Sequence, residues 1–191
     1  MKILFTGGGT GGHIYPLVAV GVDLQGLCHQ LWINLDLRYL GAYGSFRKVL
    51  EEGNIRVMRV AESKLRRYFS IGNFIDGPKF VYSLLQALCK IYWFMPDVVF
   101  SKGGPGAFAV VLVARFYRIP VIIHESDTAP GMTNLMSSRF AKLVLVSFAS
   151  SAQYFRNKNV YLVGNPIRRY LLRDKEEGNK EKNKQVLDFS S

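Results

Sequence analysis

A glycine-rich segment near the start of the chain, residues 7–13, contains five glycines and ends in a histidine. The apolar residues before it predict a buried strand at about residues 2–6, and Pro16 after it suits the first turn of a helix over residues 17–30. A backbone nearly bare of side chains between a strand and a helix offers N–H groups to an anion beside the positive end of the helix dipole. The run therefore constrains the chain to an α/β fold with an anion site close to His13.

Strand and helix signals alternate along the rest of the chain. Further strands are expected at residues 35–40, 55–60, 96–101, 120–125, 143–146 and 160–163, and further helices at residues 46–52, about 78–94, 107–117 and 131–140. This alternation predicts a Rossmann-like, mainly parallel sheet with right-handed crossovers and helices on both faces. Such sheets bind ligands at the carboxyl ends of their strands. The loops expected to meet at that edge are residues 7–13, 102–106 and 124–134.

The chain is strongly basic. Its 191 residues carry a formal net charge of +11, while residues 174–191 hold five acids and four lysines. The positive surplus therefore lies in the α/β part and favours an anionic partner, which can be nucleic acid, anionic lipid or a phosphorylated substrate.

The composition divides the chain into residues 1–167, which carry the α/β pattern, and residues 168–191, which are rich in Lys, Glu, Asn and Arg. The second part is expected to be a linker or tail. No signal peptide or membrane span is expected, because the longest apolar candidate, residues 80–95, contains polar residues and is shorter than about 20 residues. Cys28 and Cys89 show no paired spacing and are expected to be reduced and buried, as in a cytosolic protein.

The glycine run formally satisfies the dinucleotide fingerprint, with glycines at positions 7, 9 and 12. That fingerprint also needs an acid at the end of the second strand to hold a ribose. Here the strand ends Tyr39-Leu40-Gly41, and Asp36 lies too early. The sequence therefore disfavours a dehydrogenase, and no cofactor and no metal ion is expected.

The fuller string of residues 7–13, Gly-Gly-Gly-Thr-Gly-Gly-His, resembles the first glycine loop of the MurG family of bacterial cell-wall glycosyltransferases, in glycosyltransferase family 28. Three further segments resemble motifs of that family in the same order and spacing: residues 97–104, residues 119–134 and residues 163–168. The resemblance covers about residues 1–170. Two departures are Pro105 where many members have Tyr, and Ser126-Asp127 where Gln-Asn is usual.

The resemblance implies the N-terminal half of a GT-B enzyme, in which two Rossmann-like domains flank a cleft. The family transfers N-acetylglucosamine from UDP-N-acetylglucosamine to undecaprenyl-pyrophosphoryl-N-acetylmuramyl-pentapeptide (lipid I), making lipid II for peptidoglycan. Residues 1–167 would then bind the lipid acceptor and the membrane, and the UDP-sugar would bind a C-terminal domain that this sequence lacks. The chain alone is expected to be inactive.

The resemblance also implies roles for single residues. His13 is the candidate general base, with capping of the loop or phosphate binding as the alternative. The residues expected to bind the acceptor and its diphosphate are Thr10, Gly11, Gly12, Gly103, Gly104, His124, Glu125 and Asn134. Those expected to face the donor are Thr10, Gly11, Gly12, His13, Asn134 and Arg168. For the pair His124-Glu125 the alternative is a hydrogen-bonded strut, and for Asn134 it is a hydrogen bond at a helix start.

A basic loop and an aromatic helix predict a membrane-binding patch. The residues expected in it are Lys64, Arg66, Arg67, Phe80, Trp93 and Phe94. Because the helix is apolar on nearly every side, we expect part of it to enter the interface of the inner leaflet, aided by anionic lipids. The alternative is a core helix with a few exposed aromatic residues. The expected location is the cytoplasmic face of the bacterial membrane, as a peripheral protein.

Two other function classes remain open. A non-catalytic, membrane-anchoring acceptor subunit of a split GT-B transferase would carry the same fold. A nucleic-acid binder would explain the charge, but the aromatic residues cluster in one helix rather than across a sheet, and no known nucleic-acid-binding module is recognised. No nucleic-acid partner is therefore expected.

Overall fold

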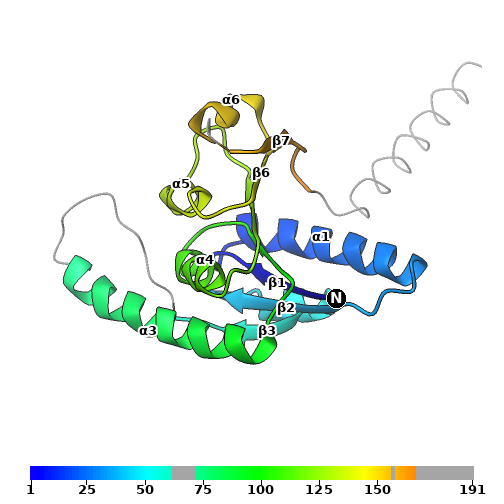
Figure 1. Cartoon of the computed structure of the whole chain (residues 1–191), viewed down its shortest axis with the longest axis horizontal. Coiled ribbons are helices and arrows are strands. Elements are labelled where there is room, and N and C mark those ends of the chain that lie inside the picture. The colour runs from blue at the N-terminus through cyan, green and yellow to red at the C-terminus, as the bar shows by residue number, and fades with distance from the viewer. Residues whose placement is uncertain (62–71, 156–157, 167–191) are drawn as a thin grey trace, which may run out of the picture.

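The computed structural model describes residues 1–61, 72–155 and 158–166, and side chains 72–76 lie outside this description. One seven-stranded sheet runs through it in the order β3-β2-β1-β4-β5-β6-β7, and every pairing is parallel (Figure 1). The strands are β1 (Lys2–Thr6), β2 (Asp36–Gly41), β3 (Arg56–Arg59), β4 (Val98–Ser101), β5 (Val121–Glu125), β6 (Leu143–Val146) and β7 (Val160–Leu162). The Rossmann-like parallel sheet predicted from the sequence is confirmed.

Helices connect the strands and cover both faces of the sheet. They are α1 (Gly11–Gln30), α2 (Arg47–Glu52), α3 (Gly72–Phe94), α4 (Ala107–Phe116), α5 (Met132–Ser138) and α6 (Ala149–Ala152), with a 3₁₀ turn at Gln153–Phe155. The predicted starts of α1 and α3 were several residues too late. In α1 the extended residue Thr10 is the N-cap, so Gly11 and Gly12 form the first turn. The four-residue α6 and the 3₁₀ turn were not predicted.

The strand order reverses between β1 and β4, which are neighbours in the sheet. Their last residues, Thr6 and Ser101, are paired, and the backbone N–H of Lys102 donates to the carbonyl of Thr6 over 2.9 Å. The chain leaves β1 toward α1 on one face and leaves β4 toward α4 on the other. In doubly wound sheets this reversal opens a crevice at the carboxyl edge, where ligands bind.

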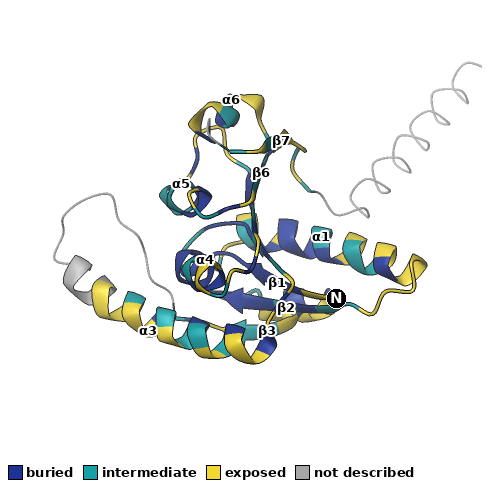
Figure 2. Ribbon diagram, viewed as in Figure 1, coloured by how far each residue is buried: buried dark blue, intermediate teal, exposed yellow. Residues whose placement is uncertain are grey.

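Alternate residues of β1 enter two separate cores. Ile3 and Phe5 pack in a cluster with residues of α1 and α2, whereas Leu4 packs in a cluster with residues of α3 and α4. The central strands are thus buried on both faces, which explains their nearly continuous apolar sequence (Figure 2). Buried Tyr39 donates its hydroxyl to the carbonyl of Gly7 over 2.8 Å and fixes the start of the glycine loop.

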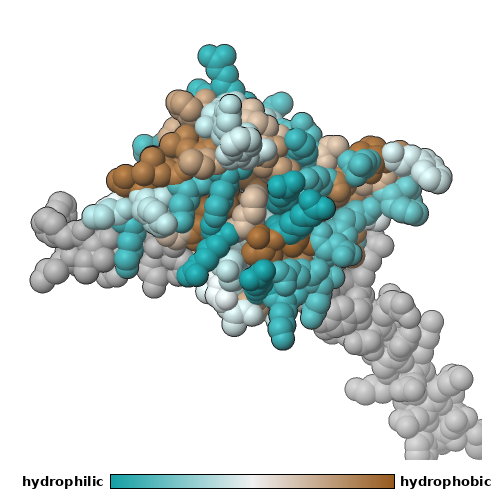
Figure 3. Space-filling view, turned by 90° about the horizontal axis from the view of Figure 1, so that it is seen from below, coloured by the Kyte–Doolittle hydropathy of each residue, from teal (hydrophilic) through white to brown (hydrophobic). Residues whose placement is uncertain are grey.

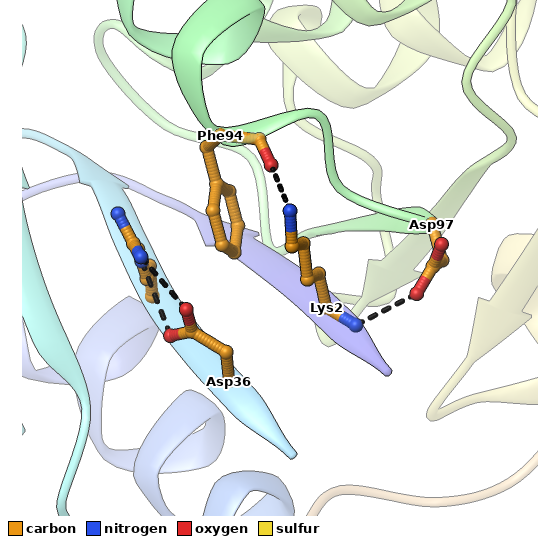
Figure 4. A network of polar contacts seen from close by, with 5 residues as sticks. Lys2, Asp36, Phe94 and Asp97 are labelled. Atoms are coloured by element: carbon orange, nitrogen blue, oxygen red, sulfur yellow. Dashed lines mark hydrogen bonds and ion pairs between the residues drawn. The ribbon is translucent and has the colours of Figure 1, made fainter. Parts of the chain in front are cut away.

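The C-terminal end of α3 is tied to the amino edge of the sheet (Figure 4). Lys2 Nζ donates to the carbonyl of Phe94 over 3.1 Å, and the backbone N–H of Lys2 donates to Asp97 Oδ2 over 2.7 Å. The guanidinium of Arg38, paired with Asp36, lies 4.2 Å from the centre of the Phe94 ring. Phe94 is only 3% exposed, so its predicted place in a membrane patch is wrong.

The two cysteines differ in exposure. Cys28 is buried as predicted, but the prediction for Cys89 is wrong because this residue lies on the outer side of α3 and is exposed. Both are free thiols. Within the described ranges, no helix is both long and apolar enough to cross a membrane.

Candidate active site

The two glycine loops touch at the carboxyl edge of the sheet. A Cβ on Gly104 would lie 2.8 Å from the Cα and N of Gly8, and one on Gly8 would lie 2.9 Å from Pro105 Cδ. Gly104 also has a φ of +89°, which disfavours any L side chain. Glycine is therefore needed at both positions for the loops after β1 and β4 to close against each other.

His13 stands where these loops meet, in the first turn of α1. Its Nδ1 lies 2.7 Å from Thr10 Oγ1, and a Cβ on Gly104 would lie 3.0 Å from its Nε2. Burial lowers the pKa of His13, and the nearby Lys102 ammonium lowers it further, although Asp127 and Glu125 act in the opposite direction. Near pH 7 the imidazole is therefore neutral and able to accept a proton.

Glu125, at the end of β5, organises the opposite wall. It is buried, and its Oε1 accepts the backbone N–H of Asp127 over 2.9 Å. Its Oε2 accepts the backbone N–H of Gly131 over 3.2 Å and Asn134 Nδ2 over 3.0 Å. Asn134 also packs against Gly103, where a Cβ would overlap its amide oxygen. This geometry fits the strut interpretation of Glu125 and makes the amide of Asn134 part of that strut.

His124 is a structural link. It is 1% exposed, and its ring stacks on Phe100 with the centroids 6.3 Å apart. Its Nε2 lies 3.0 Å from the carbonyl of Gly164, so the Nε2–H tautomer donates to that oxygen and ties the segment after β7 to β5. Burial, helped by Lys102, lowers the pKa of His124 to about 4. The predicted acceptor contact does not fit a side chain so deeply buried, whereas the strut alternative does.

Lys102 is the site residue that the sequence reasoning missed. It follows β4 directly, is 3% exposed, and lies in the cavity together with His13. Burial lowers its pKa to about 8, against the opposing effect of Glu125 and Asp127. The sequence feature that could have identified it is a lysine placed between a buried strand and a glycine loop.

A small cavity of about 110 Å³ joins these groups. The residues that line it are His13, Lys102, Gly104, Glu125, Ser126, Asp127, Gly131, Thr133 and Asn134. Apart from two glycines, the residues that line it carry polar or charged side chains, so it suits hydroxyl or phosphate groups rather than an apolar ligand. Larger hollows lie elsewhere; the one around Ile119 and Phe140 is lined by the cations Arg115, Arg118 and Lys142 and by no histidine or carboxylate. Among the described residues no three His, Cys, Asp or Glu side chains lie together as metal ligands would.

The structure brings together most of the site residues predicted from the sequence. His13, Gly104, Glu125 and Asn134 line the cavity, while Thr10 and Gly103 adjoin it through His13 and Asn134. Gly11 and Gly12 form the first turn of α1, where Gly12 is exposed. Four predicted residues lie outside the described residues: Lys64, Arg66, Arg67 and Arg168.

An apolar stripe runs along the outer side of α3. Its exposed members recur at helical spacing and are joined by one residue of α4: Val81, Tyr82, Leu85, Tyr92, Trp93 and Phe116. Trp93, predicted in the membrane patch, is 84% exposed, whereas Phe80 turns inward and stacks on Phe108 with ring centroids 6.0 Å apart. The face seen in Figure 3, on which α3 lies, carries hydrophobic areas among hydrophilic side chains. We call these six residues the α3 stripe.

Comparison with known proteins agrees with this geometry. The model of the glycosyltransferase family 28 N-terminal domain matches residues 3–146, which include both glycine loops and the Glu125 wall. The chain belongs to glycosyltransferase family 28. The structure of MurG from Acinetobacter baumannii superposes with a TM-score of 0.64 at 26% identity, covering 87% of this chain and 44% of that protein.

Two relatives of this chain carry the name UDP-N-acetylglucosamine–N-acetylmuramyl-(pentapeptide) pyrophosphoryl-undecaprenol N-acetylglucosamine transferase. The Bacillus cereus protein, whose name ends in "transferase 2", is 37% identical over 99% of this chain. The Clostridium botulinum protein is 39% identical over 94% of this chain. These alignments cover 51% and 48% of the two relatives, so the chain spans about half their length. UDP-GlcNAc 2-epimerase from Neisseria meningitidis, with a TM-score of 0.65 at 17% identity over 99% of this chain and 55% of the epimerase, shares the fold.

Proposed function

We propose that this chain is the acceptor-binding part of a transferase that moves N-acetylglucosamine from UDP-N-acetylglucosamine onto lipid I, making lipid II for peptidoglycan. The observation that carries the proposal is the position of His13, held by Thr10 at the junction of two glycine loops, where burial favours the neutral imidazole by lowering its pKa. It gains support from the transferases of B. cereus and C. botulinum, which are 37–39% identical to this chain over about half their length.

The reaction joins an acceptor hydroxyl to the anomeric carbon of the sugar. The hydroxyl oxygen attacks that carbon, the bond to UDP breaks with its electron pair staying on the diphosphate, and the hydroxyl proton must be removed. His13 serves as the base when its Nδ1–H donates to Thr10 Oγ1, because Nε2 then carries the lone pair. Such a base accelerates transfer by roughly 10²–10⁴-fold.

The acceptor diphosphate binds at the ends of the glycine loops. Two helices of 20 and 10 residues, α1 and α4, begin at this edge with glycine-rich first turns or caps. Their N-termini combine free N–H groups with partial positive charge, and Gly12 leaves open space beside its backbone. Gly11, Gly12, Gly103 and Gly104 thus let a phosphate approach the backbone, while Glu125 and Asn134 keep the facing loop in place.

The donor binds mainly to a second domain that faces this edge. The transferase relatives are about twice as long as the matched region, which leaves room for such a domain. From this chain, Thr10, Gly11, Gly12, His13 and Asn134 would face the donor, and Arg168 would follow after the described residues. Because the diphosphate leaving group needs this second domain, the chain alone is expected to be inactive.

The membrane surface that presents lipid I is bound through the α3 stripe. Lys79 and Arg115 are exposed near its two ends, and the chain as a whole carries a net charge of +11. Exposed aromatic residues enter the headgroup region, and each basic residue adds about 1 kcal/mol on an anionic surface. The protein would then act peripherally at the cytoplasmic leaflet, where its acceptor is embedded.

A fusion enzyme tests the function. The chain is joined to the C-terminal half of the B. cereus relative and assayed for transfer of N-acetylglucosamine from the UDP-sugar to lipid I. The fusion is expected to form lipid II, and the 191-residue chain alone is expected to form none. Transfer by the chain alone would contradict the two-domain account, and a folded fusion that binds both substrates without turnover would contradict the catalytic role of this half.

A further inference from the structure

Lys102 places an ammonium group in the interior with no hydrogen-bond or ion-pair partner among the described residues. Its side chain is 3% exposed and makes no hydrogen bond or ion pair to the described residues, whose side-chain ion pairs are Arg38–Asp36 and Arg47–Glu51. Burying an unpaired ammonium costs free energy, so such residues are rare unless a partner arrives from outside. Lys102 lines the cavity, which makes the cavity the place where that partner would arrive.

The two nearest carboxylates do not neutralise Lys102. Glu125 is occupied by three donors, the backbone N–H groups of Asp127 and Gly131 and the amide of Asn134. The side chain of Asp127 is exposed at the rim of the cavity and forms no ion pair with Lys102. His13, in the first turn of α1, lines the same cavity, and so does Gly104 in the loop before α4. The unpaired ammonium and the nearby start of α1 together favour an anion.

We propose that Lys102 binds a phosphate oxygen in this cavity and that the bound phosphate, acting through Lys102, increases the proton affinity of His13. The inference rests on the proposed function, in which the diphosphate of the acceptor supplies the phosphate. Lys102 touches the substrate, and it affects the base by its charge rather than by accepting a proton.

The coupling follows from the charges that face His13. Lys102, from the loop after β4, disfavours the protonated imidazole, while Asp127 and Glu125, from β5 and the loop after it, favour it. Without an anion, the ammonium keeps His13 a weak base. A bound phosphate pairs with the ammonium and adds negative charge nearby, so that His13 accepts a proton more readily. The base would thus reach full strength only when the acceptor is in place.

The experiment is a pH titration of the His13 imidazole by NMR in the 191-residue chain, with and without inorganic pyrophosphate. We expect saturating pyrophosphate to raise the titration midpoint of His13 by about one pH unit. In Lys102→Met the midpoint without ligand should be higher than in the native chain, and pyrophosphate should bind about tenfold more weakly and shift the midpoint less. Lys102→Arg keeps the charge and should keep both responses.

The matched control is Lys142→Met, which removes the same charge from an exposed residue just before β6. It should behave as the native chain. An unchanged His13 midpoint on adding pyrophosphate to the native chain would overturn the proposal whether or not the Met variant folds, and so would equal pyrophosphate affinity in the native and Met chains.

A second arm separates the two possible sources of diphosphate. UDP-N-acetylglucosamine, at the same concentration, should not reproduce the pyrophosphate response, because the donor is expected to bind the other domain. An equal response would assign Lys102 to the donor diphosphate and overturn its role toward the acceptor. Failure of these titrations leaves transfer by the fusion enzyme intact, so it is distinguishable from failure of the proposed function.

Discussion

The hydroxyl oxygen of Thr10 lies 2.7 Å from Nδ1 of His13, three residues further along the chain. Thr10 is the N-cap of α1, a position where a hydroxyl usually accepts a backbone N–H of the first turn. Here the side chain makes no such cap bond. Its hydroxyl is used to orient the imidazole instead, so the contribution of Thr10 is to the site more than to the helix.

Thr10→Val in the fusion enzyme should lower kcat about tenfold with little change in KM, because the imidazole loses the partner of Nδ1. The melting temperature of the 191-residue chain should barely change, since no cap bond is lost. Thr10→Ser keeps the hydroxyl and should retain most of the activity. A variant that is destabilised by the ~1 kcal/mol typical of a lost cap, yet keeps its kcat, would contradict this role.

Gly104→Ala should lower the free energy of unfolding by about 1–3 kcal/mol, measured by chemical denaturation. The added Cβ would meet the backbone of Gly8 at 2.8 Å, and the φ of +89° is unfavourable for alanine. Gly26→Ala is the matched control, because Gly26 lies in the exposed interior of α1 with open space around it and should be stabilised by about 0.5–1 kcal/mol. Equal effects at the two glycines would show that the loops do not close as described.

The fold could be predicted from the sequence because its signals are local. Each buried strand is a short apolar run bounded by a glycine, a proline or a charged residue, and each parallel pair needs a crossover helix. Element boundaries were less predictable. Glycine normally disfavours helices, yet Gly11 and Gly12 lie in the first turn of α1, because the helical hydrogen bonds begin at the backbone carbonyl of Thr10.

The direction of each side chain within α3 could not be predicted from the sequence either. The helix is apolar nearly all round, so the sequence pattern does not distinguish the face that packs on α4 from the face that stays exposed. Phe94 and Trp93 are neighbours in the sequence, but one is 3% and the other 84% exposed. Phe94 packs in the core and contacts Arg38, and these contacts join residues far apart in the chain.

The site was predicted where it depends on backbone geometry and missed where it depends on burial. The glycines and His13 could be identified from their spacing in the sequence. The burial of Lys102 follows from the meeting of three loops, which no local pattern contains, and the hydrogen bond from His124 to Gly164 spans 40 residues.

Acid should destabilise the chain through His124. Its pKa is about 4 when folded and about 6.5 when unfolded, so the unfolded chain binds the proton first as the pH falls. Stability is unaffected above pH 6.5, decreases between pH 6.5 and 4 by up to about 3 kcal/mol, and levels off below pH 4.

Chemical denaturation at several pH values measures this pH dependence of the free energy of unfolding. His124→Gln keeps an amide donor for Gly164 and does not titrate, so its stability should depend less on pH in that window. The matched variant His29→Gln, at an exposed residue of α1, should keep the slope of the native chain. Identical slopes in all three proteins would exclude His124 as the acid-sensitive group.

Trp93→Ser should weaken binding to anionic vesicles about tenfold, because the indole leaves water when the α3 stripe enters the interface. The chain contains one other tryptophan, Trp32, which is 93% exposed and lies beyond the end of α1. Trp32→Ser is therefore the control and should leave binding unchanged. Co-sedimentation at low and high salt measures both, and equal losses in the two variants would argue against the α3 stripe as the membrane contact.

The most direct measurement is kcat of the fusion enzyme carrying His13→Gln, with lipid I and UDP-N-acetylglucosamine both saturating. Glutamine can still meet Thr10 Oγ1 but cannot take a proton. The account predicts that kcat falls by roughly 10²–10⁴-fold while binding of inorganic pyrophosphate persists. A kcat equal to that of the unsubstituted fusion would contradict the role of His13 as the base and, with it, the proposed catalytic role of the glycine loop.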